Sequence, residues 1–293
     1  MEVIISDESA KKTADCGGKI LPHEFCIPVK VFLGHVLNLL EKGVDQVLLP
    51  RMTNRGKNNY FCPKLIGLPE IVQYTTGLSP ERMFSPEIIC NGLQLKVTRF
   101  PKNEIFSVAK MKNAEQIANC DWEKILIQCR RERITLPEAI SGIKRTRPVI
   151  SLNIGVLGYA YCLYDPIISK KIINKLSDLG VAISTWEMIE PALIEQQLAG
   201  LKRPLFWNFG RMILGAGLHF LNGSEIDGII YVSAFGCGPD SVATKILSLE
   251  AKRKNKPLLV ISLDEHTEDG HLQTRLEAFT EMITEKREDY QII

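Results

Sequence analysis

Three cysteines of this 293-residue chain stand at points where a strand or loop gives way to a helix. They occur in the segments HEFCIPVK (Cys26), NNYFCPK (Cys62) and FGCGPDS (Cys237). A proline follows each cysteine within two residues, and proline is tolerated in the first turn of a helix. We therefore expect each sulfur near a helix N-terminus, which favours thiolate over thiol and tolerates a negatively charged cofactor. A context that recurs three times indicates a role beyond core packing.

The spacing of the cysteines excludes the common local metal motifs. The chain has no C-x2-C pair, no zinc-type combination of cysteine and histidine pairs, and no ferredoxin run. A metal bound by these thiols would take its ligands from segments far apart in the sequence, and soft thiolates suit an iron–sulfur cluster. The competing interpretation is that the cysteines are small core hydrophobes.

A second polar group follows the last expected strand. The turn DEHTEDGH contains the acidic residues Asp264, Glu265 and Asp269, flanked by His266 and His271. Both histidines could face a ligand or cap the following helix. No phosphate-binding loop appears, and the glycines of IGVLG lack the order of a dinucleotide fingerprint.

The remaining cysteines fit structural roles better. Cys120 and Cys129 fall in helical patterns and Cys162 follows a buried strand pattern, whereas Cys90 precedes an Asn-Gly turn signal and is ambiguous. Cys16, in ADCGGKI, has two readings of equal weight: an extra ligand on a flexible Gly-Gly hinge, or a free thiol.

The elements that must position these residues follow an α/β pattern. In the first half, apolar periodicity predicts helices at 31–43 and 64–77, strands at 45–52 and 93–100, and helical structure over 103–140 with Asp121 as an N-cap. In the second half it predicts strands at 149–158, 181–185, 226–235 and 256–264, with helices at 170–180, around 188–220, at 241–254 and at 273–287. Such alternation predicts parallel sheets covered by helices.

The polar, basic segment GIKRTRP (142–148) marks the expected domain boundary. The sequence thus predicts an N-terminal α/β domain over 1–147 and a C-terminal α/β domain over 148–293. Each would have a mainly parallel sheet flanked by helices.

Composition bears on the partners and the cellular location of the protein. The net charge is +2, with 45% hydrophobic and 24% charged residues, so nothing favours nucleic acid or an anionic membrane as partner. The N-terminus lacks a basic leader, and the longest apolar stretch, near 149–164, is too short to span a bilayer. We expect a cytoplasmic protein whose thiols stay reduced.

Several segments together resemble the 2-hydroxyacyl-CoA dehydratase family. They are CIPVKVFLGHVLNLLEKGVDQVLLPR with the following Cys-Pro, LGYAYCLYDPIISKKIINKLSDLGV, FWNFGRMILGAG, DGIIYVSAFGCGPDS and LDEHTEDGHLQTRLEAF. The resemblance covers roughly 20–280 and is nearest to dehydratase-like proteins that occur with an ATP-hydrolysing activator, a group that includes double-cubane cluster proteins.

The resemblance implies a two-domain α/β protein with an iron–sulfur cluster between its domains. By motif the three cluster cysteines correspond to Cys26, Cys62 and Cys237, with Cys16 lacking a counterpart. An activator with its own cluster would supply a low-potential electron driven by ATP hydrolysis. The chain carries no activator domain, so that protein is expected to be separate, and the chain is shorter than catalytic dehydratase subunits.

Three functions remain open at this stage. The first is an iron–sulfur protein, with a four-iron cubane or a larger double-cubane cluster, that accepts electrons from the activator and reduces a small molecule. The second is a 2-hydroxyacyl-CoA dehydratase subunit. The third is a non-catalytic electron relay or cluster-assembly component. Either a homodimer or a heterodimer is expected, and the residues that perform catalysis are not identified.

Overall fold

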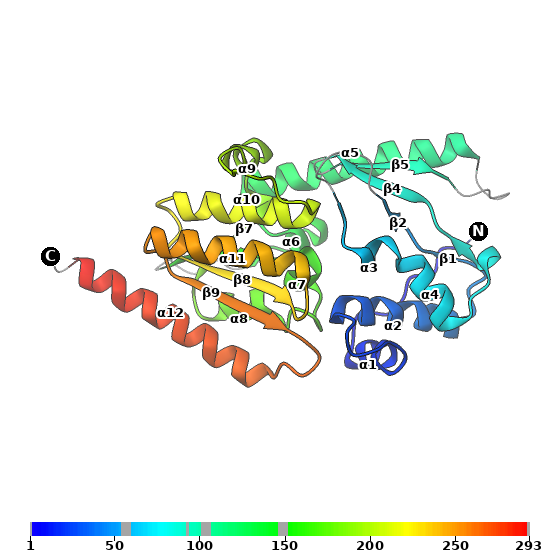
Figure 1. Cartoon of the computed structure of the whole chain (residues 1–293), viewed down its shortest axis with the longest axis horizontal. Coiled ribbons are helices and arrows are strands. Elements are labelled where there is room, and N and C mark those ends of the chain that lie inside the picture. Colours follow the sequence, from blue (N-terminus) through cyan, green and yellow to red (C-terminus); the bar gives the residue numbers. More distant parts are fainter. Residues whose placement is uncertain (1, 54–59, 92–93, 101–106, 146–151, 292–293) are drawn as a thin grey trace. The chain divides into compact units, whose positions relative to one another are not determined.

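The computed structural model describes residues 2–53, 60–91, 94–100, 107–145 and 152–291. Packing contacts divide the chain into two units: unit 1 comprises 1–124 and 205–208, and unit 2 comprises 125–204 and 209–293. Both units combine helices with mainly parallel sheets, which confirms the predicted α/β class (Figure 1). The expected boundary between 147 and 148 lies outside the described residues and stays a prediction.

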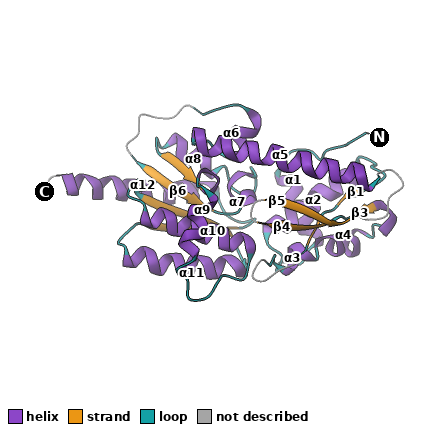
Figure 2. Ribbon diagram, turned by 90° about the horizontal axis from the view of Figure 1, so that it is seen from above, coloured by secondary structure: helices purple, strands orange, loops and turns teal. Residues whose placement is uncertain are grey.

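Unit 1 is built on two small sheets. Its helical elements are α1 (Lys11–Ile20), α2 (Ile27–Glu41), α3 (Pro63–Ile66), α4 (Leu68–Thr76), η1 (Pro80–Arg82) and the first part of α5 (Val108–Glu132). Its strands are β1 (Val47–Leu48), β2 (Arg51–Met52), β3 (Met83–Phe84), β4 (Glu87–Asn91) and β5 (Gln94–Arg99). β1 pairs with β3 and β2 with β4 in parallel. β4 and β5, which lie side by side in Figure 2, form an antiparallel pair.

The structure corrects three local predictions in unit 1. The strand expected at 45–52 is two short strands separated at Pro50, because proline has no backbone N–H for the ladder. β4 was not predicted. Asp121 lies inside α5 and is not its N-cap. The helices at 31–43 and 64–77 are confirmed as α2 and as α3 with α4.

Helices α1 and α2 pack with their backbones in direct contact. A Cβ atom placed on Gly17 would lie 1.8 Å from the carbonyl oxygen of Lys30, and one on Gly34 would lie 1.9 Å from that of Thr13. The glycines are required for this close approach. The Gly-Gly pair beside Cys16 is therefore part of a packed helix and not the hinge that the sequence suggested.

Unit 2 contains a four-stranded parallel sheet in the order β7-β6-β8-β9. The strands are β6 (Asn153–Leu157), β7 (Ala182–Thr185), β8 (Gly228–Ala234) and β9 (Leu258–Leu263). The helical elements are the last part of α5, α6 (Leu136–Ser141), α7 (Ala160–Tyr164), α8 (Ile172–Asp178), η2 (Trp186–Met188), α9 (Pro191–Leu198), α10 (Asn208–Asn222), α11 (Gly238–Arg253) and α12 (Asp269–Gln291). These match the order predicted for the second half.

Helices cover both faces of this sheet. Gly155 of β6 lies against Phe220 of α10, and α10 in turn packs on α11 through Gly217 and Leu247. On the other face, Gly228 of β8 lies against Ile283 of α12, which also packs against α8. β8 is buried along its whole length, as expected for a central parallel strand.

The strand order has a functional consequence. From β6 the chain first moves to β7 on one side and then crosses to β8 on the other. The loops after β6 and β8 therefore flank a topological switch point, where ligands bind in open α/β sheets. Separately, none of the helices in the described part of the chain is long and apolar enough to cross a membrane.

Candidate functional site

All three cysteines singled out from the sequence are helix N-cap residues. Cys26 precedes α2, Cys62 precedes α3 and Cys237 precedes α11, each with a proline in the first two helical positions. Each is half-buried, and none forms a disulfide. The predicted placement at helix N-termini is thus confirmed for the whole set.

Cys26 and Cys62 belong to unit 1 and share one backbone geometry. Their φ and ψ angles are −66° and 151° for Cys26 and −66° and 150° for Cys62. Burial raises the pKa of the Cys26 thiol, while the Lys64 ammonium and the Val29 N–H lower it and Cys62 raises it further. The Lys64 ammonium donates a hydrogen bond to the carbonyl of Glu24 and lies over the ring of Phe25, so a cation lies next to the segment that carries Cys26.

Cys237 belongs to unit 2 and lies at the switch point of its sheet. The turn after β8 exposes 66% of Phe235, and Gly236 has a φ of 72°, which favours glycine. The N–H of Cys237 donates to the carbonyl of Ala234 at 3.2 Å, which closes the turn. Strand β8 thus delivers the thiol directly to the start of α11.

A buried carboxylate lies beside Cys237. Asp240, in the first turn of α11, is 2% exposed and accepts a hydrogen bond of 2.8 Å from the Tyr231 hydroxyl to its Oδ1. Its Oδ2 has no hydrogen-bond partner among the described residues. Burial raises the pKa of Asp240 to about 6, although Tyr231, Tyr159 and Cys237 act to lower it. The hydrogen bond from Tyr231 of β8 therefore holds this carboxylate in the first turn of α11, three residues after Cys237.

Tyrosines from the loop after β6 complete this region. Tyr159 is the N-cap of α7 and is buried, with its ring 5.5 Å from that of Tyr161 and 5.6 Å from that of Phe209. Burial raises the pKa of Tyr159 and Tyr161, and Asp240 and Cys237 raise it further. Both tyrosines therefore stay protonated and can donate hydrogen bonds near Cys237.

Sequence reasoning did not identify Asp240, Tyr159, Tyr231 or Lys64. A signal existed for two of them: Asp240 is three residues after Cys237 in a first helical turn, and Lys64 is two residues after Cys62. Nothing in the sequence points to Tyr231, since a tyrosine in an apolar strand is ordinary. Its role depends on the packing of α11 on β8.

Unit 2 buries another carboxylate at the end of β7. Glu187 is 1% exposed and accepts hydrogen bonds at Oε1 from the Tyr164 hydroxyl and, at 3.2 Å, from the backbone N–H of Leu136. Its Oε2 has no hydrogen-bond partner among the described residues. Burial raises the pKa of Glu187, and the hydrogen bond from Tyr164 opposes that shift. This residue connects α6, α7 and β7.

The acidic turn after β9 has a local structural explanation. The N–H of His266 and the Thr267 hydroxyl both donate to Oδ1 of Asp264, and the N–H of Asp264 donates to the Thr267 hydroxyl, each at 2.9 Å. Asp269 and His271 lie in the first turn of α12. These contacts close the turn through Asp264 and Thr267, and both the capping role and the ligand-facing role of the two histidines stay predictions.

The other five cysteines lie in different settings, and Cys120 is exposed on α5. Cys129 and Cys162 are buried, and burial raises the pKa of Cys129 to about 12. Cys90 lies in β4, where burial raises its pKa to about 11. Cys16 is half-buried in α1. Its predicted role as a ligand stays a prediction.

Within the residues that the structure describes, no three histidine, cysteine, aspartate or glutamate residues are grouped as a metal site. Two of the candidate thiols belong to unit 1 and the third to unit 2. The predicted metal site between domains is therefore not tested by the geometry of either unit alone.

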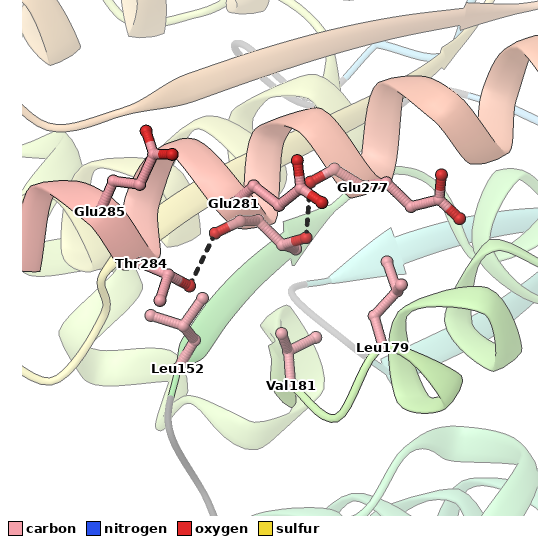
Figure 3. A pocket seen from close by; sticks show the side chains of 8 residues that line it. Leu152, Leu179, Val181, Glu277, Glu281, Thr284 and Glu285 are labelled. Carbon is pink, nitrogen blue, oxygen red and sulfur yellow. Dashed lines mark hydrogen bonds between the residues drawn. The ribbon is translucent and has the colours of Figure 1, made fainter.

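Two pockets of unit 2 lie at the opposite end of the sheet. One has a volume of about 320 Å³, with Leu152, Leu179 and Val181 facing carboxylates of α12 (Figure 3). The other, of about 260 Å³, is lined by Asp227, Lys256 and Pro257 among others. Leu152, Val181 and Pro257 each come before a strand, so these pockets lie at amino ends, away from the switch point.

Two protein-family models match the chain. Residues 1–189 match the model described as a CoA enzyme activase uncharacterised domain, and residues 218–283 match the 2-hydroxyglutaryl-CoA dehydratase D-component. The second match contains Cys237, Tyr231 and Asp240, and the first contains Cys26 and Cys62. No curated protein matches the chain.

Proposed function

The chain belongs to the family of the CoA enzyme activase uncharacterised domain and is a dehydratase-family component, and we propose that it is an iron–sulfur protein supplied with electrons by a separate ATP-dependent activator. Cys26 and Cys62 of unit 1 and Cys237 of unit 2 are the proposed ligands. The observation that carries the proposal is that all three are partly exposed N-cap residues, each followed by proline.

The chemistry of the donor set fits such a cluster. Thiolate sulfurs bind iron in these clusters, and helix N-termini favour the thiolate form. Hydrogen bonds to ligand sulfurs help to set the potential of a cluster, and the N-terminal turns that follow these cysteines carry backbone N–H groups. Cys129 and Cys162 are buried, so they suit core packing better.

Three protein ligands would leave one iron of a four-iron cluster open to a small substrate or a bridging sulfide. Around that position the chain would contribute Tyr159 and Tyr161 as hydrogen-bond donors and Asp240 as an acceptor. The electron would come from the activator, where ATP is hydrolysed, since this chain has no phosphate-binding loop. The small substrate would accept it.

The test is anaerobic purification followed by a count of iron and acid-labile sulfide. We expect a brown protein with at least about four irons per chain, the content of one cubane. A larger content per dimer would indicate the double-cubane type. A colourless protein with stoichiometric zinc would contradict the proposal.

A second candidate is a 2-hydroxyacyl-CoA dehydratase subunit, which the match of 218–283 to the D-component favours. In that case the open iron would bind the thioester carbonyl. Purified protein, activator, ATP and a low-potential donor should then dehydrate a 2-hydroxyacyl-CoA, whereas the leading proposal predicts reduction of a small molecule without CoA. Multiple turnovers with ferredoxin and no ATP would contradict both.

Cys16 separates this proposal from the electron-relay alternative, in which it would be an additional ligand and not a free thiol; we also propose that the protein is cytoplasmic and dimeric. If Cys16 completes a fully ligated cluster, Cys16→Ser should open one iron and change the electron paramagnetic resonance spectrum. An unchanged spectrum would leave Cys16 as a free thiol and remove the electron-relay interpretation that depends on it.

A further inference from the structure

Lys64 connects the two segments that carry the thiols of unit 1. It is the second residue of α3, two positions after Cys62. Its Nζ donates to the carbonyl oxygen of Glu24 at 2.6 Å and lies 5.1 Å from the centre of the Phe25 ring. Glu24 and Phe25 directly precede Cys26. One side chain thus links residues 40 positions apart, next to both cysteines.

Lys64 makes two kinds of contact with this loop, a directional hydrogen bond and a cation–π contact. A carbonyl oxygen accepts a hydrogen bond from the ammonium, and the face of an aromatic ring attracts the same cation. Together they hold the start of α3 against the loop before α2. Because each cysteine is the N-cap of its helix, holding these two chain segments together also sets the separation of the two sulfurs.

The charge of Lys64 also suits this position. Two neighbouring thiolates repel each other, and a cation beside them reduces that repulsion. The contacts of its Nζ with Glu24 and Phe25 place this cation at the two residues that directly precede Cys26.

We propose that Lys64 is a positioning residue that holds Cys26 and Cys62 as a preformed pair for a soft, thiolate-binding group. The identity of that group as an iron–sulfur cluster rests on the proposed function. The pair itself is a property of unit 1 and exists in metal-free protein. Lys64 acts through the two thiols.

The experiment uses full-length, reduced, metal-free protein and phenylarsine oxide as the probe. Its arsenic forms two As–S bonds with a pair of thiols while the oxide oxygen leaves as water with both thiol protons, so no oxidant is needed. The Cys26–Cys62 bridge is quantified by mass spectrometry over a range of probe concentrations. Lys64→Gln removes the charge, Lys64→Arg keeps a cation that can bind carbonyl and ring, and Lys96→Gln is an exposed lysine control in the same unit.

We expect Lys64→Gln to weaken bridging by about tenfold, equivalent to about 1.4 kcal/mol. Lys64→Arg should stay within about threefold of the wild type, and Lys96→Gln should match it. Wild-type bridging in Lys64→Gln, or an equal loss in Lys64→Arg, would overturn the proposal. Iodoacetamide labelling of Cys237 should stay unchanged in every variant, and a parallel change there would mean general destabilisation and likewise overturn it.

The bridging experiment and the iron count can fail independently of each other. Bridging that depends on Lys64 in a protein that binds no iron would support the positioning role and reject the cluster. Iron binding with bridging that ignores Lys64 would reject the positioning role alone.

Discussion

The thiols of the two units share a local geometry but differ in electrostatic environment. In unit 1, Cys26 and Cys62 lie beside the ammonium of Lys64. In unit 2, Cys237 lies beside the buried carboxylate of Asp240, which Tyr231 holds by a hydrogen bond of 2.8 Å. The two units therefore share the local arrangement of an N-cap cysteine followed by proline. The charged group near the cysteine is an ammonium in unit 1 and a carboxylate in unit 2.

This difference suggests a division of roles. A cation favours thiolate and therefore stable ligation, whereas a nearby carboxylate adds negative charge. If the proposed cluster is bound, added negative charge would make it harder to reduce, in line with the proposed ATP-driven reductant. Under that proposal Cys26 and Cys62 would anchor the cluster, and Asp240 beside Cys237 would tune its potential.

The largest expected effect tests whether both units supply ligands. Cys26→Ser, Cys62→Ser and Cys237→Ser should each lose or degrade the cluster, seen as loss of iron and of visible absorption. Cys120→Ser, at an exposed position of α5, and Cys129→Ser, at a buried one, should keep it. A Cys237→Ser protein with full iron content would limit the site to unit 1.

The next effect concerns the contact between α1 and α2, the helix that Cys26 precedes. Gly17→Ala would place a Cβ 1.8 Å from the carbonyl oxygen of Lys30, so α1 must move away from α2. We expect the free energy of unfolding to fall by about 3 kcal/mol, measured with urea. Gly18→Ala is the matched control, since its Cβ would approach the protein only to 4.0 Å at the Lys30 side chain. Equal losses in both variants would show that helix contact is not the cause.

A smaller effect is expected on the carboxylate of unit 2. Tyr231→Phe removes the hydroxyl that donates to Asp240 and leaves a buried carboxylate oxygen without that donor. The free energy of unfolding should fall by about 2 kcal/mol, because an unsatisfied buried polar group loses both water and partner. Tyr74→Phe, on a side chain that is 84% exposed, should have no effect. A stable Tyr231→Phe protein would show that the pair does not fix α11.

The smallest effect compares how carboxylates of the two units respond to pH. Burial raises the pKa of Glu187 above 4.5, so its stabilising contribution is present below pH 4.5 and is lost as pH rises through the raised pKa. Arg51 lowers the pKa of Glu70 below 4.5, so its contribution is present above pH 4.5 and is lost as pH falls through the lowered pKa.

Urea unfolding of wild type, Glu187→Gln and Glu70→Gln between about pH 3 and pH 8 measures these slopes. Relative to Glu187→Gln, the wild type should lose stability as pH rises. Relative to Glu70→Gln, it should gain stability as pH rises from the acidic side. Slopes of the same sign would show that these two carboxylates do not differ as the structure indicates.

The sequence by itself determined the α/β class, the order of elements in unit 2 and the place of each candidate cysteine. These features are predicted by apolar periodicity and by proline or glycine at element ends. Both signals involve residues that are close together in the sequence, so the sequence alone contains them. Pro50 is a signal of this local kind, and it indicates that 45–52 is not one continuous strand. β4 was missed because its place in a sheet depends on pairing with β2 and β5, and the residues of β4 alone do not show that pairing.

Only the tertiary structure decided what surrounds each thiol. Lys64 reaches Glu24 across 40 positions, and Tyr231 meets Asp240 only when α11 folds back on β8. Gly17 belongs to the Gly-Gly pair that resembled a hinge in the sequence, and Gly34 was expected inside a helix. Both lie where two helix backbones touch. Electrostatics and close packing depend on distances in space, and distances between segments far apart in the chain arise only when the chain folds.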